Sequence, residues 1–76
     1  MIPTKSIKYD PSKPAQNTYY WDKWMEARNP HLGQDSVQYI FDQWVAGEIS
    51  IIVPITVVNE WQMSELKTWK EENRRG

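Results

Sequence analysis

Apolar positions recur at helical spacing in the middle of the chain. Between residues 36 and 46 they fall at three- and four-residue steps, at Val37, Ile40, Phe41, Trp44 and Val45. This spacing is typical of a helix with one face on a core. Asp35 is expected to be its N-cap, with Gln38 at the capping-box position, and Gly47 is the expected C-terminal stop. The pattern predicts a helix over about 36–46.

Two further segments have helical patterns. Residues 18–28 place apolar and charged positions on opposite sides of a helix that Asn17 or Thr18 can cap and Pro30 ends. Residues 60–73 follow Asn59, another N-cap type, and Trp61 points either over the end of a neighbouring strand or into solvent. Met63, Leu66 and Trp69 can share one face of this last helix. We expect most of Trp21, Trp24, Trp44 and Trp69 to lie in the core.

The segment ISIIVPITVV, residues 49–58, is the most apolar in the chain and is rich in β-branched residues, which favours a strand. Pro54 in its middle has no N–H, so it marks an edge strand, a bulge or a hairpin. KSIKY, residues 5–9, alternates in polarity and is a candidate partner strand. The expected fold class is α+β: a small, mostly helical single domain with three helices on a short strand or two-stranded sheet.

The first sixteen residues differ in composition from the rest. They contain Pro3, Pro11 and Pro14 among lysines and serines, which predicts an extended or partly ordered arm over 1–16 and one compact domain over 17–76. The chain has neither the apolar core of a signal peptide nor the roughly 20 apolar residues that span a bilayer. These observations predict a cytoplasmic protein.

Composition narrows the possible chemistry. The chain has no Cys and a single His, His31, whereas a structural zinc site needs about four N or S ligands. No cofactor or metal is therefore expected. Ten aromatic residues can supply the core instead. No serine lies in a G-x-S-x-G context, and Asp22 and Glu26 lie beside Lys23 on a polar helix face. We expect no enzyme.

Charge is segregated along the chain. Residues 29–66 contain no Lys or Arg, yet they hold Asp35, Asp42, Glu48, Glu60 and Glu65. Both flanking segments carry an excess of cations. Either the basic ends fold back over the acidic middle, or the acidic residues form a face that docks on a basic partner.

The order of elements suggests one known architecture. WDKWMEARNPHLGQDSVQYIFDQWVAGEIS and the apolar strand after it, residues 21–58, resemble small winged-helix or helix-turn-helix proteins such as phage excisionases in their apolar spacing. The resemblance implies DNA binding, with the 36–46 helix as the recognition helix. That helix presents Gln38, Tyr39, Asp42 and Gln43 to solvent and no cation, although phosphate contacts supply most DNA affinity.

We therefore predict a non-enzymatic protein–protein interaction module, with a winged-helix or helix-turn-helix DNA-binding protein as the alternative. Small, Cys-free, aromatic-rich chains without catalytic groups are common among phage and mobile-element accessory proteins. The expected partner is a host nucleic-acid-handling (defence) protein with a basic surface, which this chain would inhibit. A homodimer through the edge of the 49–58 strand is a further option. The candidate partner-binding residues are Asp35, Tyr39, Asp42, Glu48, Trp61 and Tyr19.

Overall fold

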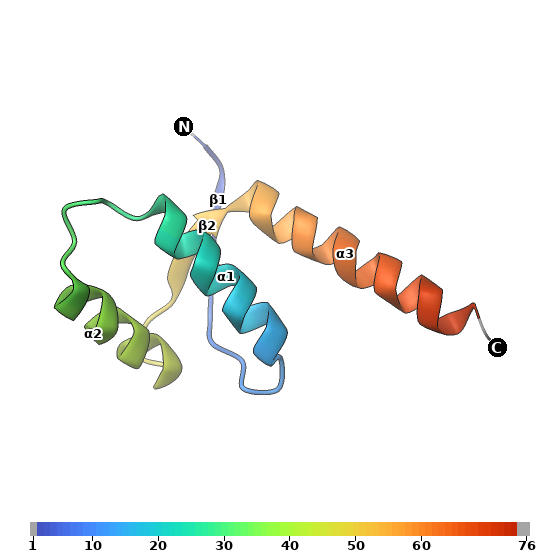
Figure 1. Cartoon of the computed structure of the whole chain (residues 1–76), viewed down its shortest axis with the longest axis horizontal. Helices are drawn as coiled ribbons and strands as arrows, with labels where there is room; N and C mark the ends of the chain where they lie inside the picture. The colour runs from blue at the N-terminus through green and yellow to red at the C-terminus, as the bar shows by residue number, and fades with distance from the viewer. Residues whose placement is uncertain (1, 75–76) are drawn as a thin grey trace.

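A computed structural model describes residues 2–74 of the chain and has an α+β fold. Three helices pack on a two-stranded antiparallel sheet, as the sequence predicts (Figure 1). In the described part of the chain, no helix combines the length and the apolar composition needed to cross a bilayer. The elements in chain order are β1 (Thr4–Ile7), α1 (Pro14–Ala27), α2 (Gln34–Val45), β2 (Ile51–Pro54) and α3 (Ile55–Asn73).

The sheet joins the start of the chain to its apolar middle segment. β1 and β2 pair with Thr4 opposite Pro54 and Ile7 opposite Ile51, which confirms the predicted pairing of 5–9 with 49–58. Side chains alternate across β2, because Ile51 and Val53 are buried while Ile52 between them is 51% exposed. One face of the sheet therefore carries the core.

Pro54 ends β2 instead of interrupting it, so the predicted strand over 49–58 was too long. α3 begins at the next residue, and the Ile55 N–H donates to the Pro3 carbonyl at 2.9 Å. The apolar residues after Pro54, expected in the strand, form the first turns of α3, and Val58 turns into the core. Asn59 therefore lies inside the helix and does not cap it.

Two other helix starts differ from the prediction. α1 begins at Pro14, four residues early and inside the segment expected to be an arm. Proline fits this first turn because its missing N–H would have no helical partner there. α2 begins at Gln34 after Gly33, and no side chain caps it, so the capping box at Asp35 and Gln38 was wrong. Its predicted end is confirmed, since Gly47 has the positive φ of 79° expected of a helix stop.

Asn17, predicted as a cap, instead joins α1 to the loop before it. The side chain is 6% exposed. Its Nδ2 donates to the Asp10 carbonyl at 2.6 Å, and its Oδ1 accepts from the Asp10 N–H at 3.1 Å. Ser12 donates to the Asp10 carboxylate through its hydroxyl and its N–H, and these bonds lower the pKa of Asp10. The loop between β1 and α1 is thus fixed by its own polar groups.

The core is built around Trp44 of α2. Its side chain is fully buried and its Nε1 donates to the Ile7 carbonyl at 2.9 Å. Trp21 stacks on it at 5.6 Å between ring centroids and on Trp24 at 4.8 Å, and Tyr9 meets it edge-on at 5.1 Å. The other buried apolar core residues are Tyr20, Val37, Ile51, Val53 and Val58. Aromatic bulk carries this core without disulfides.

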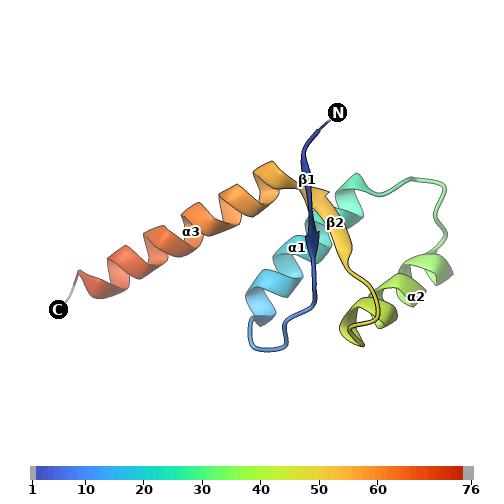
Figure 2. The ribbon, with the colours of Figure 1, turned by 180° about the vertical axis from the view of Figure 1, so that it is seen from behind.

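The second half of α3 leaves this core. In Figures 1 and 2 the helix runs away from the sheet and α1, and its C-terminal turns have no other element beside them. Trp69 is 59% exposed there, whereas Trp21, Trp24 and Trp44 pack in or against the core, so most of these four tryptophans lie where the sequence predicts. Met63 and Leu66, expected to share a packed face with it, are also exposed. Helical spacing predicted the helix correctly but not where its support ends.

Candidate functional site

Acidic and aromatic side chains share one side of α2. Asp35, Tyr39 and Asp42 are spaced four and three residues apart, so they lie on the same side of the helix. All three are exposed, Tyr39 at 65%. Gln38 donates to the Asp42 carboxylate at 3.0 Å and orients it. Glu48 is exposed just beyond the helix, where its N–H closes the last turn. We call Asp35, Tyr39, Asp42 and Glu48 the acidic face.

The rest of the chain leaves the acidic face without counter-charges. Within residues 2–74 the one ion pair joins Lys23 and Glu26, at 3.6 Å and both on α1. No cation of the described chain ends therefore pairs with a carboxylate of residues 29–66. The interpretation that the basic ends fold back over the acidic middle has no support at the acidic face, although lysines of the N-terminal segment share a groove with Glu65. The negative charge of the acidic face is turned to solvent.

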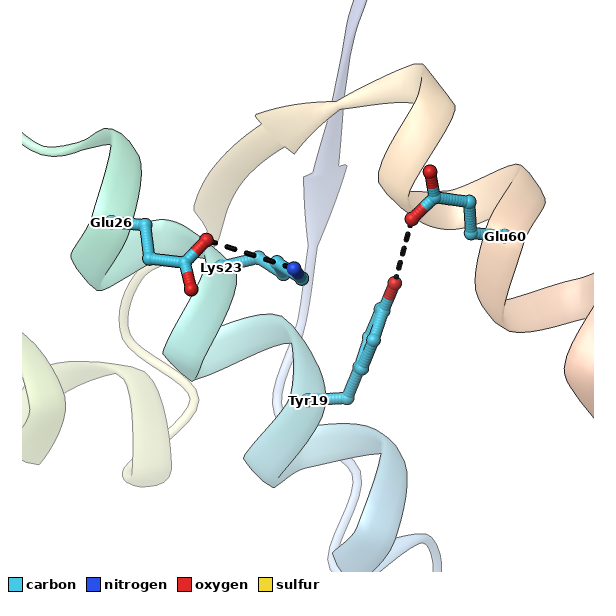
Figure 3. Close-up of polar contacts among 4 residues, drawn as sticks. All are labelled: Tyr19, Lys23, Glu26 and Glu60. Atoms are coloured by element: carbon cyan, nitrogen blue, oxygen red, sulfur yellow. Dashed lines mark hydrogen bonds and ion pairs between the residues drawn. The ribbon is translucent and has the colours of Figure 1, made fainter.

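Tyr19 and Trp61 lie elsewhere, at the joint between α1 and α3. Their ring centroids are 5.2 Å apart, and both side chains are half-buried against the core. The Tyr19 hydroxyl donates to Glu60 at 3.2 Å, while Lys23 lies 5.8 Å from the centre of the Tyr19 ring and pairs with Glu26 (Figure 3). These contacts join two elements of the fold.

The environment of Tyr19 keeps its hydroxyl protonated. Burial is the main cause that raises its pKa, followed by the hydrogen bond to Glu60 and the negative charge of that carboxylate. At neutral pH the phenol is therefore a donor to Glu60. The α1–α3 joint therefore combines an aromatic contact with a hydrogen bond that Tyr19 of α1 donates to Glu60 of α3.

The six sequence-predicted residues thus fall into two groups. Asp35, Tyr39, Asp42 and Glu48 belong to α2 and the turn after it, whereas Tyr19 and Trp61 belong to the α1–α3 joint. α2 and α3 lie on opposite sides of α1 and the sheet in both ribbon views (Figures 1 and 2). One flat partner surface does not cover both groups, so the acidic face is the stronger candidate.

A basic groove escaped the sequence analysis. It lies between β1, the start of α1 and the middle of α3, and it has an open volume of about 460 Å³. Its charged lining residues are three lysines, Lys5, Lys8 and Lys13, and two carboxylates, Asp10 and, on the α3 side, Glu65. The signal in the sequence was three lysines within nine residues. They were assigned to an arm because the three prolines around them favour extended chain.

The arrangement offers surfaces for binding. Over residues 2–74, no three His, Asp or Glu side chains gather in a way that could hold a metal ion. Arg28 has a local role, since its Nη1 donates to the Leu32 carbonyl at 3.2 Å across the α1–α2 connection. The groups that face solvent together are carboxylates, lysines and aromatic rings. Such groups recognise a partner through charge and apolar contact.

Comparison of the chain with protein-family models, with curated proteins and with solved structures finds no match in any of the three.

Proposed function

We propose that the protein is a non-enzymatic interaction module that binds a basic surface of a protein partner through the acidic face. The observation that carries the proposal is that the carboxylates of this face have no cation beside them within residues 2–74. Carboxylates that face solvent along one helix attract a basic surface and steer its approach. The segregation of charge along the sequence thus places negative charge on one side of α2.

Tyr39 supplies the apolar contact that charge alone lacks. It is the large aromatic residue of α2 that stays exposed, at 65%, between Asp35 and Asp42. Tyrosine is enriched in interface hot spots because its ring buries much area while its hydroxyl keeps a hydrogen bond. An exposed aromatic ring between two carboxylates suits a partner pocket whose rim carries Lys or Arg.

Nucleic-acid-handling proteins are the partner class with the strongest basic surfaces, because they bind phosphate backbones. A carboxylate face that covers such a surface would compete with the nucleic acid. We therefore infer an inhibitory role against a host nucleic-acid-handling or defence protein, as an accessory protein of phage or mobile-element type would have. The short, Cys-free chain with an exposed acidic helix supports this type.

Charge reversal on the acidic face tests the proposal. A tagged chain and its Asp35→Lys/Asp42→Lys variant are used to capture proteins from host lysate, and the affinity of a captured protein is then measured with and without competing duplex DNA. We expect the double variant to lose capture at unchanged thermal stability, because both residues are exposed. We also expect duplex DNA to displace the natural chain from its partner.

Glu71→Lys/Glu72→Lys is the matched control, since it makes the same change in net charge on the exposed end of α3. It should bind as the natural chain does. Equal loss of capture in both double variants would mean that net charge alone causes the loss. Unchanged capture by Asp35→Lys/Asp42→Lys would mean that the acidic face does not contact the partner. Either result would end the proposal.

The basic groove favours the alternative, direct binding to DNA. Lys5, Lys8 and Lys13 face it together and could contact phosphates. Against this, the exposed side of α2 would bring Asp35 and Asp42 toward the backbone. A gel-shift assay with duplex DNA at low salt separates the two functions: retardation that Lys5→Ala/Lys8→Ala/Lys13→Ala abolishes supports DNA binding, and no retardation removes it.

A further inference from the structure

The side of α3 that faces away from the core carries a pattern of its own. Asn59, Met63, Leu66 and Lys70 follow at steps of four, three and four residues, which places them on one line along the helix. All four are exposed, Met63 at 68% and Leu66 at 45%. Val58 and Trp61, which pack on the core, point to the other side. We call these four residues the outer face of α3.

An open groove runs along the same surface. Met63, Leu66, Lys67, Lys70 and Arg74 line it, and its volume is about 710 Å³. No other element contributes a residue to this groove. Two apolar side chains are flanked by three cations, whose aliphatic stems extend the apolar surface, and by the Glu71 carboxylate. The described part of the chain leaves this surface uncovered.

The area balance shows how much surface is uncovered. The chain exposes 5954 Å², whereas a compact monomer of its mass exposes about 4,900 Å². Its radius of gyration is 14.4 Å, against about 11 Å for a compact chain of this length. The excess of about 1,000 Å² is close to the ~800 Å² that each partner buries in an interface of standard size. An interface on α3 would restore ordinary burial.

Charges on α3 favour a second copy in antiparallel orientation. Glu60, Lys67 and Arg74 follow at seven-residue steps along one edge of the outer face. In a parallel pair each Lys70 would face the same lysine of the other copy. In an antiparallel pair centred between Met63 and Leu66, Lys70 lies level with Asn59 of the other copy, and Lys67 lies two residues, about 3 Å along the axis, from the level of Glu60. The antiparallel arrangement also opposes the two helix dipoles.

We propose that two copies of the chain associate through the outer face of α3, antiparallel, with Met63 of each copy against Leu66 of the other. Lys67 of each copy pairs with Glu60 of the other. Tyr19 donates to Oε2 of Glu60, so the second carboxylate oxygen of Glu60 is the one that would accept from Lys67. The pair joins two bodies at opposite ends of a central helix pair and leaves the acidic face of each copy free.

Cysteine cross-linking tests the orientation, and the chain suits it because it has no cysteine. Asn59→Cys and Lys70→Cys chains are oxidised separately and as a mixture. In the proposed register residue 59 faces residue 70 of the other copy, whereas identical positions lie on the order of 16 Å apart along the axis. We expect a disulfide-linked heterodimer from the mixture and little product from either variant alone.

Each other result contradicts the proposal in a different way. Cross-linking of each variant with itself would mean a parallel pair. No product in any sample, with a monomer by sedimentation at every concentration, would mean no self-association. A dimer by sedimentation without product would place the interface elsewhere, and the exposed edge of the sheet is then the next site to test.

Substitutions in the outer face separate loss of the pair from loss of the fold. Leu66→Glu should sediment as a monomer with an unchanged circular dichroism spectrum, and Thr68→Glu, also exposed but on the opposite side of α3, should stay dimeric. Glu60→Lys and Lys67→Glu should each weaken association, and the double variant should restore it. Failure of the double variant to restore association would contradict the proposed register.

Discussion

The body of the molecule and the second half of α3 use the same residue type in opposite ways. Trp44 is fully buried, stacks on Trp21 and holds β1 through a hydrogen bond, whereas Trp69 is 59% exposed. Both tryptophans lie in helices with apolar residues at helical spacing. The difference comes from neighbouring elements: Trp44 contacts Trp21 of α1 and Ile7 of β1, and the sheet and α1 also lie beside the first turns of α3 but not beside the rest of that helix. Burial here is decided by where a helix has a neighbour.

Substitution of each of the two tryptophans should show the largest difference in stability between the body and the second half of α3. Trp44→Ala is expected to cost about 3–5 kcal/mol, because it leaves a large cavity and removes the bond to Ile7. For a domain whose total stability is about 5–15 kcal/mol, that loss approaches global unfolding. Urea denaturation followed by far-UV circular dichroism measures it. Trp69→Ala is the control and should change stability by less than about 0.5 kcal/mol; equal losses would mean that α3 is supported along its whole length.

Two asparagines allow the same comparison between the body and the end of α3 with a polar side chain. Asn17 is buried and bonds both backbone groups of Asp10, whereas Asn73 bonds the Trp69 carbonyl at the exposed end of α3. Asn17→Ala should cost about 1–3 kcal/mol, because the partly buried N–H and C=O of Asp10 lose their partners. Asn73→Ala should have little effect. Thermal denaturation of the two variants gives the order, and the reverse order would contradict the role assigned to Asn17.

The smallest expected effect is the pH dependence of the body. Burial, followed by the negative charge of Glu65, raises the pKa of Tyr20 above its ordinary value of 10.0. The unfolded chain therefore loses this proton first as pH rises, and stability falls from about pH 10 up to the raised pKa. Tyr20→Phe should remove part of that alkaline loss, measured by urea denaturation at several pH values. Tyr39→Phe, on the exposed side of α2, should leave it in place.

Much of the fold could be predicted because local pattern and tertiary packing agree. In α2, the apolar spacing and the glycine stop identify the helix and its buried residues Val37 and Trp44, although Val45 of the same pattern is 41% exposed. The apolar run around Pro54 shows the limit: β-branched residues favour a strand locally, but the four after the proline gain more by turning Val58 into the core as helix. Tertiary packing overrode propensity at that point.

The candidate site was predictable to the extent that it is local. Asp35, Tyr39 and Asp42 share one side of α2, and helical spacing alone indicates this. The Tyr19–Trp61 contact joins residues distant in the sequence, and spacing carries no information on which of them meet. The outer face of α3 was missed for a related reason: Met63 and Leu66 look like core residues until the extent of the sheet is known.

The bond from Trp44 to Ile7 has a kinetic consequence. It spans 37 positions in the sequence, and the β1–β2 pairing closes a still longer loop. The three helices depend mostly on local contacts and can begin to form in microseconds. The β1–β2 pairing and the hydrogen bond from Trp44 to Ile7 form only after the chain has lost the conformational entropy needed to close that loop. We therefore expect the ordering of β1 against β2 to be the slow step in the folding of this largely helical protein.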